Sequence, residues 1–248
     1  MRRYGYNRLR ETFPSTNEWG IPDLDPEMLG EIHDPSTPFV VWKHTRPEPA
    51  ILGFFVDDYK FKCVWNYPER ALAAIQEREY VAICEPDFSL YDDRPRAEWI
   101  WAVYKARWCG VFWQLNGIRV IPTLMWTDED SYKFVFAGIP KNPPCVALET
   151  RAAKANPDEY NKGLLVAIEH LQPKQILVYG SDKPCHRALA ELGLADSVNV
   201  IHYSGFSPAK RIREAKKLKQ KEQLFLPEST NQPFQELLKK TVVNLVEH

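Results

Sequence analysis

Carboxylates stand at the ends of the strand-like apolar runs of this chain. Six such runs lie between residues 51 and 203, and an acidic side chain follows five of them. In parallel α/β folds the active site lies beyond the carboxyl ends of the strands. We therefore expect five residues to form a catalytic site at that rim: Asp57, Asp58, Asp87, Glu149 and Asp182.

Carboxylates on one rim suit two kinds of chemistry. Their oxygens are good ligands for Mg²⁺ or Mn²⁺, and two carboxyl groups with different pKa values can divide acid and base roles. Simpler explanations compete with both. Asp is a usual residue at helix N-caps, which is a sufficient explanation of Asp128 and Asp182. An ion pair with Arg151 would equally explain Glu149.

The element that must position these residues is a β-α-β unit between residues 80 and 125. An apolar run at 80–84 is followed by an acidic turn, a long helix and a second apolar run. The helix is predicted to begin at Pro95 and to end at Asn116-Gly117, a common C-terminal signal. Apolar spacings of three and four predict a wide buried stripe: Ala97, Ile100, Trp101, Tyr104, Trp108, Val111, Phe112 and Leu115.

The alternation of strand and helix continues towards the C-terminus. Further strands are expected at 145–150, 175–179 and 198–203, with helices at 128–136, 157–171 and 184–192. Runs at 39–42 and 51–56 add one or two strands at the other end. This order predicts an α/β fold with a mainly parallel sheet and alternating helices. We expect a barrel-like or partial (β/α) barrel, with an open doubly wound sheet as the alternative.

Composition divides the chain into three parts. Residues 1–50 contain seven prolines, which favours an extended arm that wraps over a core. The α/β core domain is expected at 51–205. Residues 206–248 are expected to form C-terminal helices, the first basic and the second amphipathic.

One segment is strongly basic, although the net charge of the chain is only −1. Seven of the twelve residues at 210–221 are Lys or Arg, and a helix there would present a ridge that neutralises phosphates. Arg94 and Arg96, with Lys105 and Arg107, fall around the other faces of the tryptophan-rich helix, where single strands could stack. The nucleic-acid-binding residues are predicted to be Arg94, Arg96, Lys210, Arg211, Arg213, Lys216 and Lys217. The competing interpretation is that the helix at 210–221 is an ordinary solvent-exposed helix and that the tryptophans of the long helix belong to the core.

Several classes of protein are excluded by missing motifs. The chain has no G-x-G-x-x-G, no phosphate-binding P-loop and no C-x₃-C-x₂-C, so we expect no NAD, no P-loop ATP site and no iron–sulfur cluster. The five cysteines form no C-x-x-C pair. Cys185-His186 are neighbours on a predicted helix and point in different directions, so they cannot form a dyad by themselves. No apolar run is long enough to span a membrane, and we expect a cytoplasmic protein.

Six stretches carry a resemblance to a known family. They read FFVDDYKF (54–61), VWNYPER (64–70), PDFSLY (86–91), GVFWQLNGIRVIPT (110–123), FAGIPKN (136–142) and VYGS (178–181). Together they resemble an uncharacterised domain-of-unknown-function family of bacteria, phages and other mobile elements. The resemblance covers about residues 50–205 and implies a phage or mobile-element context. It carries no established activity.

The leading hypothesis for function is a nucleic-acid-associated protein of a phage or mobile element, which acts as an enzyme if the carboxylates converge. DNA or RNA would then be its partner, and Mg²⁺ or Mn²⁺ its cofactor. One alternative is a non-catalytic module that docks a protein partner or forms a homodimer. The other is a barrel enzyme that modifies a base or nucleotide through an Asp nucleophile, by analogy with base-exchange transglycosylases.

Overall fold

The fold is that of a computed structural model, which describes residues 11–43 and 49–204. All of these residues belong to the first of two compact units, Met1–Gly205 and Phe206–His248. The basic segment 210–221 and both predicted C-terminal helices lie outside the described residues.

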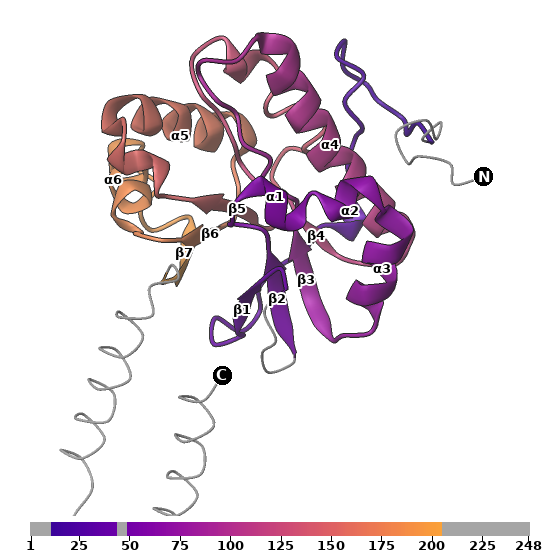
Figure 1. The fold of residues 1–248 in the computed structure, drawn as a ribbon. Coiled ribbons are helices and arrows are strands. Elements are labelled where there is room, and N and C mark those ends of the chain that lie inside the picture. Colours follow the sequence, from indigo (N-terminus) through magenta and orange to yellow (C-terminus); the bar gives the residue numbers. More distant parts are fainter. Residues whose placement is uncertain (1–10, 44–48, 205–248) are drawn as a thin grey trace, which may run out of the picture. The chain divides into compact units, whose positions relative to one another are not determined.

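Parallel strands form the centre of the described unit (Figure 1). One sheet has the order β1-β2-β3-β4 and the other the order β5-β6-β7. An isolated parallel bridge between Thr123 and Ala147 joins β4 to β5, so the strands follow one another in sequence order. The strands are β1 Phe39–Val41, β2 Ala50–Gly53, β3 Tyr80–Cys84, β4 Val120–Ile121, β5 Val146–Glu149, β6 Gln175–Tyr179 and β7 Asn199–Tyr203.

One face of each strand packs against the helices. The opposite faces of the strands pack against one another. Successive side chains of a strand point to opposite faces. Leu52, Ile83 and Val146 pack into the cluster that contains the helices, whereas Ile51 and Ala147 pack into a second cluster. The second cluster takes residues from all seven described strands and none from the described α-helices.

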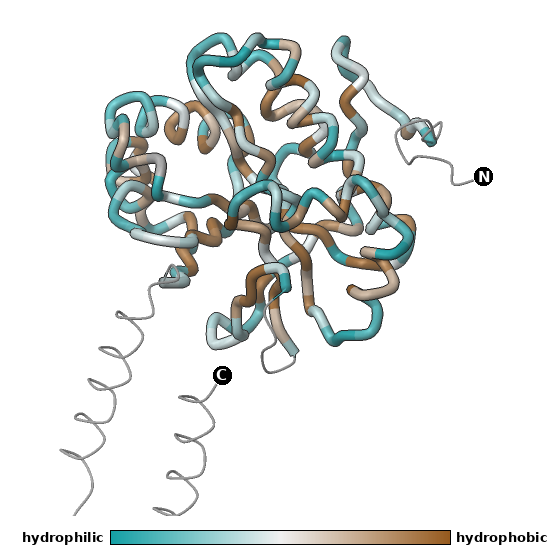
Figure 2. Tube along the Cα trace, viewed as in Figure 1, coloured by the Kyte–Doolittle hydropathy of each residue, from teal (hydrophilic) through white to brown (hydrophobic). Residues whose placement is uncertain are grey.

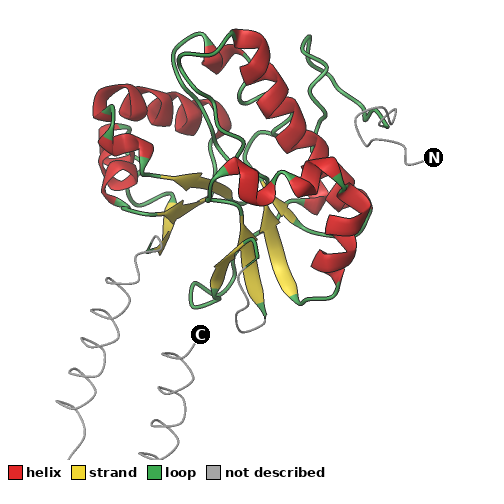
Figure 3. Cartoon of the chain, viewed as in Figure 1, coloured by secondary structure: helices red, strands yellow, loops and turns green. Residues whose placement is uncertain are grey.

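This arrangement is a partial barrel rather than a doubly wound sheet. A doubly wound sheet would place helices on both faces, but here they lie on one side of the strands (Figure 3). Hydrogen bonds between strands do not close the barrel in the described residues, where β1 and β7 are the two edges. The Tyr203 hydroxyl nevertheless donates to the carbonyl of Thr37, and the Phe39 and Tyr203 rings lie 5.1 Å apart.

The helices largely follow their local sequence signals. They are α1 Asp58–Phe61, α2 Cys63–Asn66, α3 Pro68–Gln76, α4 Arg96–Leu115, α5 Pro157–Leu171 and α6 Lys183–Glu191. The Asn156 side chain caps α5 by accepting from the Glu159 amide, with Pro157 next in the chain. Helix α4 ends where expected, because Gly117 adopts a φ of 78° that other residues rarely tolerate.

The predicted buried stripe of α4 was wrong in part. Trp108 and Val111 are buried as expected, but Trp101 is 49% exposed and Leu115 is 69% exposed. The fully buried residues of α4 include Val103, Ala106 and Arg107. The helix is covered on more than one side, by the sheet and by the N-terminal segment, so a single-stripe pattern does not describe it.

The described N-terminal segment crosses α4 and the amino ends of the strands. The Gln114 amide bonds both the N–H and the carbonyl of Asp25, at 2.9 and 3.0 Å. The Gln175 amide does the same for Ile32, at 3.0 Å each. Because Gln175 is the first residue of β6, the segment lies at the end of the strands opposite to the candidate site.

The predicted helix at 128–136 was also wrong. Only a 3₁₀ turn, Ser131–Lys133, forms there, and two similar turns occur at Pro26–Met28 and Ala152–Lys154. Apolar residues gather in the strands and in the stretches that pack on them (Figure 2). Among the described residues, none of the helices has the length and apolar character needed to cross a membrane.

Candidate functional site

Three of the five predicted carboxylates line one cavity. The cavity has a volume of about 310 Å³, and Asp57, Asp87 and Glu149 are among its lining residues. Asp57 follows β2, Asp87 follows β3, and Glu149 is the last residue of β5. Parallel strands bring these ends to one edge, so residues up to 92 positions apart in sequence meet there.

Asp87 is the most chemically distinctive of the three. Its side chain is half-buried and makes no hydrogen bond or ion pair with any residue in the described ranges 11–43 and 49–204. Burial raises the pKa of Asp87 to about 7, and the negative charges of Glu149 and Asp58 add to the effect while Arg151 opposes it. At neutral pH this carboxyl is therefore present in both protonation states.

Glu149 has a fixed orientation. Its Oε1 accepts from the backbone amide of Arg151 at 2.7 Å and from the Arg151 Nε at 2.8 Å. The Glu149 side chain is only 12% exposed, and this burial raises its pKa against the opposing effect of Arg151. The Tyr160 hydroxyl, from α5, donates to the Glu149 carbonyl at 2.9 Å.

Asp57 and Asp58 differ in their surroundings. Asp57 pairs with Lys60 at 2.8 Å, and this interaction lowers the pKa of Asp57. Asp58 does not line the cavity; it accepts from the Ser89 hydroxyl at 2.8 Å and from the Ser89 amide at 3.3 Å. Asp58 thus fixes the segment 87–91 through Ser89 without lining the cavity itself.

An aromatic wall completes the cavity. Phe88, Tyr91, Trp126 and Tyr160 all contribute, and the Trp126 and Tyr160 rings lie 5.0 Å apart. Trp126 packs directly on Gly163 of α5, where a Cβ atom would come within 2.2 Å of the indole Nε1. Tyr91 is held in turn by the Trp99 indole, which donates to its carbonyl at 2.6 Å.

Asp182 is not brought into this cavity. It is the N-cap residue of α6, although its side chain makes no capping hydrogen bond. Its Oδ2 lies 3.7 Å from His186 Nε2 and 3.9 Å from His202 Nδ1. Neighbouring Cys185 is fully buried, which raises the pKa of its thiol to about 12, so the thiolate needed for nucleophilic chemistry is disfavoured.

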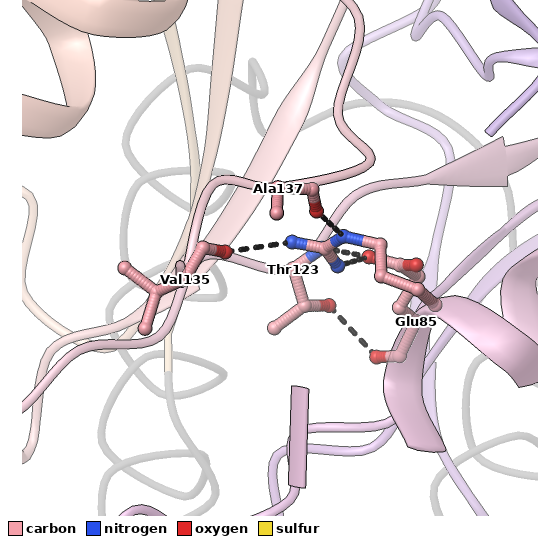
Figure 4. A network of polar contacts seen from close by, with 5 residues as sticks. Glu85, Thr123, Val135 and Ala137 are labelled. Carbon is pink, nitrogen blue, oxygen red and sulfur yellow. Dashed lines mark hydrogen bonds and ion pairs between the residues drawn. The ribbon is translucent and has the colours of Figure 1, made fainter. Parts of the chain in front are cut away.

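Sequence reasoning missed a buried ion pair between Glu85 and Arg107 beside the site (Figure 4). Both side chains are fully buried, although Arg107 was expected on an outer face of α4. Its other nitrogens donate to the carbonyls of Val135 and Ala137, both at 3.1 Å. The one available signal was position: Glu85 directly extends β3, as Glu149 extends the apolar run of β5.

Glu85 also ties the ends of β3 and β4 together. Its Oε2 accepts from the Thr123 amide at 3.1 Å, and its carbonyl accepts from the Thr123 hydroxyl at 2.7 Å. The cavity walls begin just beyond these two residues, at Asp87 and at Leu124. The network therefore fixes the backbone positions from which the two lining segments, at Asp87 and at Leu124, continue.

Of the seven predicted nucleic-acid-binding residues, two, Arg94 and Arg96, lie in the described part of the chain. Arg96 pairs with Asp130 at 2.6 Å, and Arg94 lies 3.8 Å from Asp93; both arginines are well exposed. Such exposed pairs contribute at most about 1 kcal/mol. The other five predicted residues lie in the segment 210–217, outside the described residues.

Comparison with known proteins identifies the family. Residues 13–201 match the model of a domain of unknown function, DUF4417. The chain belongs to the DUF4417 family. The match includes nearly all of the stretch 50–205 that the motifs indicated, and it extends further towards the N-terminus, to residue 13.

Two phage proteins are relatives of this DUF4417 chain. The Gene 1 protein of Mycobacterium phage D29 is 37% identical over 185 residues, which cover 71% of this chain and 66% of that protein. The Gene 1 protein of Mycobacterium phage L5 is 36% identical over 185 residues, covering 71% of this chain and 78% of that protein. The match spans slightly less than two thirds of the D29 protein. No solved structure matches this chain significantly.

Two of the motifs that carry the DUF4417 resemblance contribute to the cavity. The stretch 54–61 contains Val56 and Asp57, and the stretch 86–91 contains Asp87 and the wall that follows it. Across the described parts of the chain, no group of three or more His, Cys, Asp or Glu side chains is arranged to hold a metal ion.

Proposed function

We propose that this DUF4417 protein is an enzyme that performs general acid–base chemistry on nucleic acid or on one of its components. The observation that carries the proposal is the convergence of Asp57, Asp87 and Glu149, from three different strand ends, on one aromatic-lined cavity. Cavities with a few convergent polar groups and a titratable residue of shifted pKa are the usual location of active sites.

Asp87 is the proposed proton carrier. A general acid or base works best when its pKa lies near the working pH. The pKa of Asp87 is raised to about 7, so the carboxyl can give up a proton and take it back at neutral pH. It has no hydrogen-bonding partner among the described residues that would have to be displaced first.

Glu149 is the proposed partner carboxylate. The two bonds from Arg151 favour its charged form and fix its orientation at the rim. A charged Glu149 and a protonated Asp87 supply the two roles, base or nucleophile and acid, that hydrolysis or exchange at a C–N bond requires. These acid and base roles do not require Mg²⁺ or Mn²⁺, since the described residues contain no group of three or more carboxylate, His or Cys side chains arranged to hold an ion.

Association with DNA or RNA is expected to depend on the basic segment. The full-length chain should bind single- or double-stranded oligonucleotides with an affinity that falls steeply with salt concentration. Replacing Lys210, Arg211 and Arg213 by Ala should weaken binding at low salt and reduce the slope of log K against log salt by up to about three. Fluorescence anisotropy with labelled DNA and RNA, with and without Mg²⁺ or Mn²⁺, measures both effects.

A matched variant controls for loss of positive charge in general. Lys141, Lys162 and Lys174 are lysines of the described unit at sites that the proposal does not use, so the triple change of these three to Ala should leave binding nearly intact. Unchanged binding in the 210/211/213 variant, or equal losses in the two triple variants, would remove the basic segment from the proposal.

A further inference from the structure

Arg151 lies at the mouth of the cavity with part of its guanidinium unused. Its side chain lines the cavity and is 62% exposed. The Nε of Arg151 donates to Glu149 at 2.8 Å, and its Nη2 lies 3.4 Å from the Phe55 carbonyl, a long hydrogen bond. A guanidinium has five N–H donors. Within the described residues, both N–H groups of Nη1 and one of Nη2 therefore have no acceptor.

The contacts with Glu149 hold the guanidinium in one orientation. The Glu149 Oε1 accepts from the backbone amide of Arg151 at 2.7 Å as well as from its Nε, so one carboxylate fixes both the main chain and the side chain. A side chain that is already oriented loses less entropy when it binds a ligand. The unused end of the guanidinium presents two parallel N–H groups, which match two oxygens of a phosphate.

The exposed charges around the mouth are mainly positive. Besides Arg151, Lys60 and Lys154 are exposed. Burial raises the pKa of Glu149, and the positive charge of Lys154 is near enough to oppose this. Asp57 is the one exposed carboxylate of the lining, and Lys60 pairs with it at 2.8 Å. Three exposed cations against one exposed carboxylate attract an anionic group to the mouth.

The acidic side chains inside the cavity do not cancel this attraction. The charge of Glu149 is balanced by Arg151 in their ion pair. Asp87 is half-buried, and burial is the main cause that raises its pKa to about 7, so it is neutral in about half of the molecules at neutral pH. The cavity thus combines a cationic mouth with an interior suited to an uncharged group.

Tyr91 gives the mouth an accessible aromatic ring. It lines the same cavity and is 58% exposed, and the Trp99 indole holds its backbone by donating to the Tyr91 carbonyl at 2.6 Å. Exposed aromatic rings stack on nucleobases of any kind. Tyr91 and Arg151 line one cavity of about 310 Å³, so a single nucleotide unit can contact both.

We propose that the mouth of the cavity binds the phosphate group of a nucleotide, free or within a nucleic-acid strand, through the Nη groups of Arg151, with the base against Tyr91. This inference rests on the proposed function, because it names the substrate class of the same site: a phosphorylated unit rather than a free base or nucleoside. Arg151 is then the residue that determines this specificity.

The experiment is a calorimetric titration of the full-length protein at low salt with the four ribonucleoside 5′-monophosphates and with the four nucleosides. Each nucleotide should bind roughly tenfold or more tightly than its nucleoside, because it adds two charge-assisted hydrogen bonds. Arg151→Gln should reduce this preference to less than about twofold without weakening nucleoside binding. Ribose 5-phosphate should bind more weakly than the nucleotides, since it has no base to stack on Tyr91.

A second variant and a matched control separate binding from structure. Arg151→Gln removes the Nε bond that orients Glu149, whereas Lys154→Ala leaves that bond in place. Lys154→Ala should lower nucleotide affinity roughly two- to threefold and weaken its salt dependence. Arg119→Gln is the control: Arg119 is exposed, directly precedes β4 at the opposite end of the strands, and donates to the Glu27 carbonyl at 3.1 Å. This variant should bind nucleotides as the wild type does.

The outcomes separate this inference from the proposed function. Equal affinity for nucleotides and nucleosides, a preference that survives Arg151→Gln, or an equal loss in Arg119→Gln would overturn the inference. Ribose 5-phosphate that binds as tightly as the nucleotides would overturn the assignment to a nucleotide. A phosphate preference set by Arg151, with unchanged turnover in Asp87→Asn, would leave the inference standing and remove the acid–base proposal. Loss of turnover in Asp87→Asn without any phosphate preference would do the reverse.

Discussion

Replacing Asp87 by Asn is expected to lower the rate of product formation about 10²–10⁴-fold, the usual effect of a positioned general acid or base. The substitution keeps the size and hydrogen-bonding capacity of the side chain and removes only its proton transfer. The assay incubates DNA, RNA and nucleosides with the full-length protein, with and without Mg²⁺ or Mn²⁺, and detects products by mass spectrometry. A variant that retains wild-type turnover would exclude Asp87 from the chemistry.

The Asp87→Asn variant is expected to be at least as stable as the wild type at pH 8, so its loss of activity there would not come from unfolding. The pKa of Asp87 is raised in the folded state, so the folded protein binds more protons than the unfolded chain between about pH 4 and pH 7. Stability contributed by this carboxyl therefore falls as pH rises through that window. Asn does not titrate and avoids the loss, which urea unfolding at pH 5 and pH 8 would reveal.

Replacing Arg107 by Met is expected to lower the free energy of unfolding by about 3–5 kcal/mol, because it leaves Glu85 buried without a cation. Both side chains are fully buried in the folded protein. Burial raises the pKa of Glu85 and Arg107 opposes this, so without Arg107 the carboxyl will take up a proton as pH falls. The loss should consequently be larger at pH 8 than at pH 5.

The matched control for this change is Arg96→Met on the same helix. Arg96 pairs with Asp130 in an exposed ion pair, and such pairs contribute at most about 1 kcal/mol. The double change Glu85→Gln with Arg107→Met should be less damaging than Arg107→Met alone, since no charge is left unpaired. If Arg107→Met and Arg96→Met cost the same in urea unfolding, the buried pair does not anchor the walls of the cavity.

The convergence of Asp57, Asp87 and Glu149 followed from a topological rule rather than from any local motif. Once the strands are parallel, their carboxyl ends share an edge, and residues that follow them are brought together. The same rule led us to expect Asp182 at this cavity, but Asp182 does not line it. The place of a residue around the edge of the sheet depends on the order of the strands and on the curvature of the sheet. These place the end of β6 beyond the end of β5, and neither can be predicted from the local sequence pattern.

Local signals predicted α4, α5 and α6 but not their packing, and the helix expected at 128–136 is only a 3₁₀ turn. The start of α5 at residue 157 and the glycine after α4 are short-range features and were found where expected. The buried face of α4 was not, because the sheet and the N-terminal segment cover it from different sides. The Glu85–Arg107 pair spans 22 positions and joins a strand end to the middle of a helix, so it depends on tertiary packing alone.

The most direct test of the central claim is the titration of the Asp87 carboxyl itself, followed by carbon NMR of aspartate-labelled protein, with Asp87→Asn for assignment. The account predicts a midpoint near the value of about 7 that burial and the facing carboxylates impose. Glu149→Gln should lower the midpoint but leave it above the ordinary aspartate value, because burial is the larger cause. A wild-type midpoint near the ordinary value of 3.8 would mean that Asp87 is a charged surface carboxylate, and the acid–base proposal would fail with it.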